Sequence, residues 1–140
     1  MQRSNAGFRE IEHTADWELE AWAPDLPGLL EQAARGMYAL AGIVAGQGNT
    51  REHRLEMKAP DAESLLVNFL AELLYLEEDQ GLAFDGFDLQ LRQTDEYQLE
   101  ANLVGSPALS REKDIKAVTY HKIKVERGQR GLEVRIVFDV

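Results

Sequence analysis

The sequence contains no cysteine among its 140 residues. This absence excludes a disulfide framework, a thiolate metal site and a cysteine nucleophile. Long hydrophobic runs are absent as well, because charged residues interrupt every apolar stretch within a few positions. No segment is therefore expected to cross a bilayer. Residues 1–5 lead into charged sequence without the apolar core of a secretory signal. We therefore expect a soluble, cytoplasmic protein.

Positive charge is scarce, with 15 Lys and Arg against 25 Asp and Glu and a formal net charge of −10. Such a molecule repels phosphate at long range, so no direct nucleic-acid binding is expected. The basic residues gather in the segment 111–135, which holds 8 of the 15 and only 4 acidic residues. This segment is either a local patch for an acidic partner or a solvated strand face.

The usual catalytic signatures are also missing. The sequence has no glycine-rich phosphate loop, no His-Glu-x-x-His and no nucleophile elbow. The three histidines, His13, His53 and His121, are too scattered to indicate a zinc site. The residues by themselves therefore give little support to an enzyme.

The length fits a single domain over residues 1–140. Apolar periodicity alternates between 2 and 3.6 residues, which predicts the α+β class. One helix is expected after Asp25 and a second from Asp61 to Gly81, with aspartates as N-caps and glycine as the stop. Their apolar faces predict a compact two-layer domain in which two main helices pack on a largely antiparallel sheet.

Period-2 alternation predicts the strands. In the segment 17–21 it places Trp17, Leu19 and Ala21 on one face and the two glutamates on the other. Residues 105–114 are expected to form a polar, mobile loop, and Gly128–Gly131 is expected to be the turn of a hairpin. The expected strands cover residues 8–13, 17–21, 51–57, 87–92, 97–104, 115–125 and 132–140.

Three short segments concentrate polar chemistry: His13–Asp16, Lys116–His121 and Phe138–Val140. Locally, the first is typical of a turn and the second of a half-buried strand. Asp139 beside a terminal carboxylate offers up to four anionic oxygens. If Asp16 comes near, the set suits a hard divalent cation. Lys116 is the candidate to relieve repulsion between these carboxylates.

The sequence resembles the archease family over essentially the whole chain, and the segments that match in order and spacing are Ile11–Asp16, Leu65–Leu74, Ile115–His121 and Phe138–Val140. The resemblance implies a compact α+β fold with helices packed on a sheet. It also implies a non-catalytic helper of an RtcB-type RNA ligase in tRNA splicing and RNA repair. Such a helper promotes the ligase's reaction with guanine nucleotide and metal, and so allows multiple turnover.

Carried over from the resemblance, Asp16, Asp139 and Val140 are the expected ligands of a divalent cation, Val140 through its main-chain or terminal oxygens. Calcium is the expected ion, with magnesium and manganese as alternatives. Lys116 is expected to act in ligase activation. His13 and His121 either orient a ligand group or have only a structural role, His13 in its turn and His121 in its strand.

Two features depart from the family pattern: the aromatic Trp17 directly after Asp16, and a loop at 105–114 that looks short. Two other functions stay open. One is a general protein-binding or chaperone-like modulator of nucleic-acid-processing enzymes. The other is a metal-dependent hydrolase built around Asp16 and Asp139.

Overall fold

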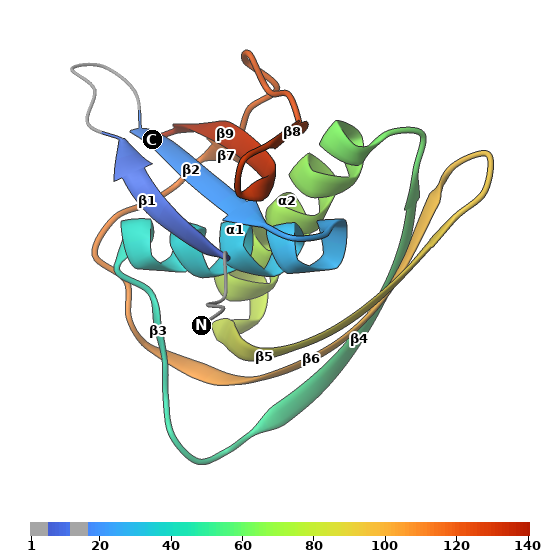
Figure 1. Ribbon diagram of the computed structural model, residues 1–140. Helices are drawn as coiled ribbons and strands as arrows, with labels where there is room; N and C mark the ends of the chain where they lie inside the picture. The colour runs from blue at the N-terminus through green and yellow to red at the C-terminus, as the bar shows by residue number, and fades with distance from the viewer. Residues whose placement is uncertain (1–5, 12–16) are drawn as a thin grey trace, which may run out of the picture.

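Two antiparallel sheets enclose a layer of two helices in the computed structural model, which describes residues 6–11 and 17–140 (Figure 1). The first sheet has the order β1-β2-β9-β7, and β8 also pairs with β9. In the second sheet, β6 is central and pairs with β3, β4 and β5. The first sheet contains β1 (Gly7–Ile11), β2 (Trp17–Ala23), β7 (Ala117–Val118), β8 (Glu126–Gly128) and β9 (Gly131–Asp139). The second contains β3 (Val44–Ala45), β4 (Arg51–Ala59), β5 (Leu82–Gln93) and β6 (Tyr97–Ser110).

The helices α1 (Leu26–Ala41) and α2 (Ala62–Gln80) begin and end at the predicted signals. Asp61 accepts a hydrogen bond from Ser64 N at 2.7 Å, and this bond lowers the pKa of the Asp61 carboxyl. Asp25 accepts the equivalent bond from Gly28 N at 2.9 Å. Gly81 closes α2 in the left-handed region, with φ of 70°. These predictions are confirmed.

The helix layer forms the core because each helix contacts both sheets. Helix α1 packs against β1, β2 and β9 of the first sheet and also contacts β5. Helix α2 packs against β4, β5 and β6 and reaches β7 of the first sheet. Burial of each large apolar side chain contributes roughly 1.5–3 kcal/mol. The largest fully buried side chains include Phe69, Phe84, Phe138, Leu19, Leu29, Leu30, Met37, Leu65 and Leu66.

The predicted α+β class, with two main helices packed on antiparallel strands, is confirmed. The strands divide into two sheets, and both helices lie between them (Figure 1). Neither helix of the described residues combines the length and apolarity that a bilayer crossing requires.

The expected mobile loop at 105–114 is wrong for its first part, because β6 continues to Ser110. Its polar residues are hydrogen-bonded to the glycine-rich segment after α1. Ser106 Oγ donates to Gly46 O at 2.6 Å, and Ser110 Oγ donates to Gly42 O at 3.0 Å. The hydroxyls that favoured a loop therefore stabilise a strand.

Candidate functional site

Pairing between β7 and β9 brings two of the polar segments together. Ala117 lies opposite Asp139, and Val118 lies opposite Phe138. The backbone N–H of Lys116 donates to the backbone carbonyl of Asp139 at 2.7 Å. Lys116 and Asp139, distant in the sequence, are therefore neighbours at the end of β9, and both are exposed.

The remaining polar segment, His13–Asp16, lies outside the described residues. The description of the chain resumes at Trp17. Trp17, which follows Asp16 in the chain, pairs with Phe138, which precedes Asp139. The Lys113 ammonium lies over the Trp17 ring, 4.1 Å from its centroid. This geometry is that of a cation–π contact.

A hollow of about 300 Å³ opens beside Asp139 and is also lined by Thr119, His121 and Val137. Thr119 fixes its wall, because its backbone N–H and its Oγ1 both donate to Val137 O at 3.0 Å. The same hydroxyl accepts from His121 N at 3.2 Å. The organising role of Thr119 was not predicted from the sequence. The sequence feature that could have indicated this role is the position of Thr119 inside the polar segment Lys116–His121.

The expected strand 115–125 is confirmed only at Ala117–Val118, the two residues of β7, and is wrong for the rest of that range. The chain then leaves β9 in a turn, closed by Ile123 N donating to Tyr120 O at 3.2 Å. Lys122 sits in this turn with φ of 55°, a left-handed conformation that a non-glycine residue seldom adopts. The chain returns to β9 at β8, whose turn Gly128–Gly131 confirms the predicted hairpin.

The donor atoms at the end of β9 suit a hard cation. Asp139 is exposed, and within residues 6–11 and 17–140 its carboxylate has no hydrogen bond or ion pair. Val140 is 41% exposed. The available ligands are oxygens, which Ca²⁺ and Mg²⁺ prefer. The described residues alone contain no group of three or more His, Asp or Glu that could hold a metal. A cation site here therefore requires Asp16 and stays a prediction.

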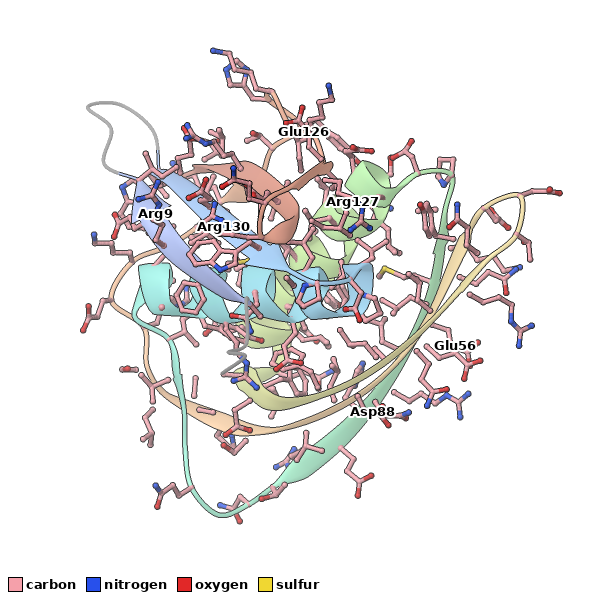
Figure 2. All side chains as sticks on the ribbon, in the orientation of Figure 1. Arg9, Glu56, Asp88, Glu126, Arg127 and Arg130 are labelled. Carbon is pink, nitrogen blue, oxygen red and sulfur yellow. The ribbon has the colours of Figure 1, made fainter. Side chains whose placement is uncertain are left out.

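The outer face of the first sheet carries a network of charges around Glu20. The side chain of Glu20 is only 8% exposed, and its oxygens lie 2.7 Å from Arg9 Nε, 3.3 Å from Arg130 Nη2 and 3.9 Å from Arg135 Nε. Figure 2 labels Arg9 and Arg130 over this sheet. Arg130 also pairs with Glu133 at 3.2 Å, and that hydrogen bond lowers the pKa of the Glu133 carboxyl.

Replacing Glu20 with glutamine is expected to lower the free energy of unfolding by about 1.5–3 kcal/mol, the value of hydrogen bonds to a buried charged group. The partners are largely solvated, with Arg9 63% exposed, so they rehydrate and the cost stays below that of a fully buried pair. Urea unfolding measures the change. The exposed Glu52 supplies the control: Glu52→Gln is expected to change stability by less than about 0.5 kcal/mol. Equal effects of the two substitutions would contradict a stabilising network.

The segment 111–114 is held against both helices. Arg111 Nε lies 3.3 Å from Glu77 Oε2, and Arg111 Nη1 lies 2.8 Å from Asp114 Oδ1. The backbone N–H groups of Glu112 and Lys113 donate to Ala41 O, at 2.9 and 3.0 Å. These bonds satisfy the end of α1 and place Lys113 over Trp17.

The model of the archease protein family matches residues 8–140 of the chain. Protein archease of Methanosarcina barkeri is 30% identical, and the alignment covers all of both chains. Protein archease of Pyrococcus furiosus is 35% identical over 86% of this chain and 88% of its own. A solved structure, the solution structure of protein 1598 of Methanobacterium thermoautotrophicum, aligns with a TM-score of 0.75 and 25% identity over 96% of this chain and 99% of its own. The chain therefore belongs to the archease family.

Proposed function

We propose that this protein activates an RtcB-type RNA ligase in tRNA splicing or RNA repair, as a partner that is not itself the catalyst. Family membership supports a modulating role in RNA processing. The observation that carries the proposal is the pairing of β7 with β9, which sets Lys116 beside Asp139. Asp139 lines the hollow, and Lys116 is bonded to it through the backbone, so the end of β9 carries an exposed positive group and an exposed negative group that a nucleotide-binding partner can contact.

Asp16, Asp139 and Val140 are the residues that would hold the divalent cation, calcium first, with magnesium or manganese as alternatives. The support from the structure is that Trp17 and Phe138, the chain neighbours of the two aspartates, form a pair across β2 and β9. The ion would supply a positive centre for phosphate oxygens. Lys116 offers a compact positive charge for the same oxygens. His121, which lines the hollow with Asp139, would orient a ligand group.

The test is ligase turnover with RNA, guanosine triphosphate and divalent metal, with and without this protein. Asp139→Asn keeps the side-chain volume but removes the charge, and Lys116→Gln removes the ammonium charge while leaving a polar side chain. Loss of a ligand group is expected to weaken the affinity for the ion by at least about tenfold. Even groups that only support metal ligands lower metal affinity or activity by about 10- to 100-fold when they are mutated. Stimulation at limiting metal is expected to fall accordingly.

Matched controls are Asp88→Asn and Lys58→Gln. Asp88 is exposed on β5 of the second sheet, away from β9 (Figure 2), and Lys58 is exposed on β4. Both controls are expected to keep full stimulation. Calorimetric titration of Ca²⁺ into the protein alone separates the two parts of the proposal. Unchanged stimulation in both site variants would refute the activation role of these residues, and unchanged Ca²⁺ affinity in Asp139→Asn would refute the ion site.

A further inference from the structure

The chain between β7 and β8, residues 119–125, projects from the edge of the first sheet (Figure 1), and we name it the β7–β8 loop. It is fixed at both ends. Thr119 is bonded twice to Val137 O, and Val125 N donates to Glu63 Oε2 at 2.8 Å. Ile123 and Val125 pack against the core. The exposed residues of this loop are therefore presented on an anchored segment.

The charge of the β7–β8 loop is opposite to that of the molecule. It carries Lys122 and Lys124 and no acidic residue, whereas the whole chain has a net charge of −10. Lys122 is exposed and makes no ion pair with any described residue. Lys124 pairs with Glu126 at 3.1 Å. A hollow of about 290 Å³ beside the loop is lined by both lysines and by Arg135 of β9. The glutamates of this hollow include Glu20 and Glu133, which are already paired with arginines.

Aromatic rings accompany these cations. Tyr120 is 55% exposed, and the neighbouring His121 is exposed as well. Exposed rings next to lysines are the combination that binds single-stranded nucleic acid, because bases stack on the rings while cations contact the backbone. An acidic protein surface would use the lysines but would leave the rings without a matching partner. The observations therefore favour a single-stranded nucleic acid over an acidic protein, and the RNA-processing role proposed above makes RNA the strand to test.

We propose that the β7–β8 loop binds single-stranded RNA, with Lys122 and Lys124 on phosphates and a base stacked on Tyr120. This goes beyond the proposed function, which requires contact with a ligase but no contact of this protein with RNA. The acidic remainder of the molecule repels the strand and confines contact to the loop. The expectation of no nucleic-acid binding, drawn from the total charge, then fails only at this place.

The expected binding is weak and sensitive to salt. Two phosphate contacts give a slope of about −1.4 for the logarithm of affinity against the logarithm of salt concentration, at about −0.7 per contact for single strands. Affinity is then expected to fall about sevenfold between 50 and 200 mM salt. Removing one lysine is expected to halve the slope.

The test is fluorescence anisotropy of a labelled ten-nucleotide oligouridine with the full chain at several salt concentrations. Lys122→Gln is expected to lower affinity and to reduce the slope to about −0.7. Tyr120→Leu is expected to lower affinity about fivefold or more without changing the slope, because stacking carries no counterion. Lys58→Gln, the same change at an exposed lysine of the second sheet, is expected to alter neither. Circular dichroism confirms that each variant is folded.

Three outcomes would overturn the proposal. One is no binding at 50 mM salt. Another is an equal effect of Lys122→Gln and Lys58→Gln. The third is that polyglutamate of matched charge displaces the RNA as well as unlabelled oligouridine does, with Tyr120→Leu neutral; the loop would then be a surface for acidic proteins. Since no ligase is present, failure here leaves ligase activation intact, and failure of activation leaves this binding intact.

Discussion

Phe138→Ala is expected to lower the free energy of unfolding by about 3–5 kcal/mol, the cost of deleting a buried phenylalanine ring. Phe138 is 1% exposed and pairs with Trp17 on one side and Val118 on the other. Its ring is therefore packed at the point where β2, β9 and β7 meet. A loss of this size corresponds to a drop of roughly 10–20 °C in the melting temperature for a chain of this length.

Urea denaturation and calorimetry measure the loss. Leu109, which is 71% exposed, provides the control, and Leu109→Ala is expected to change stability by less than about 0.5 kcal/mol. Phe138→Leu keeps most of the volume and is expected to recover part of the loss. If Phe138→Ala proved as harmless as Leu109→Ala, the packing of the candidate site on a buried ring would be wrong.

Gly131→Ala is expected to cost about 2–5 kcal/mol, because two penalties coincide. Gly131 has φ of 92°, a conformation that L side chains seldom adopt. A Cβ there would also lie 2.5 Å from the backbone oxygen of Ala23 and 2.9 Å from Pro24 Cα. Backbone atoms cannot rotate aside, so the β8–β9 turn must move away from the end of β2.

Gly81→Ala separates the two penalties. Gly81 has a similar positive φ of 70°, but a Cβ there would meet no atom within 4 Å. It is expected to cost only about 1–2 kcal/mol, the strain of the left-handed conformation. The comparison is made by urea unfolding of the two variants in parallel. Equal losses would show that the contact with Ala23 and Pro24 contributes nothing.

Local chemistry made the helices predictable. Asp25 and Asp61 accept N-terminal hydrogen bonds, and glycines close both helices in the left-handed region. These signals act within one helical turn, so the sequence contains them completely. The division into two sheets depends instead on pairings between distant segments. Period-2 alternation shows which side chains of a strand share a face, but it does not indicate which other strands pair with it.

Several predictions failed because polar side chains find hydrogen-bond or ion-pair partners far away in the sequence. Ser106 and Ser110 favoured a loop in the sequence, yet their hydroxyls bond to carbonyls more than 55 residues away. Glu20 lies on the charged face that the alternation predicted, but three arginines from β1, β9 and the turn before β9 cover it. The break after Val118 leads into a turn in which Lys122 is left-handed, a position where glycine would have given a signal.

The candidate site was predictable only in part. The neighbourhood of Lys116 and Asp139 follows from the pairing of β7 with β9, and the sequence indicated it through the family resemblance and not through any local pattern. Thr119 was missed because its two bonds to Val137 belong to the loop that follows β7. The role of Asp16 stays a prediction.

The short segment that follows β6 connects the second sheet directly to the candidate site. In the six residues between Ser110 and Ala117, the chain grips α2 through Arg111, covers Trp17 through Lys113 and joins β9 at Lys116. Ile115, in the same stretch, is buried and leaves little slack. A partner that bound the end of β6 and displaced this segment would therefore shift Lys116 as well. Because Lys116 N is bonded to Asp139 O, the position of Asp139 would respond to the same displacement.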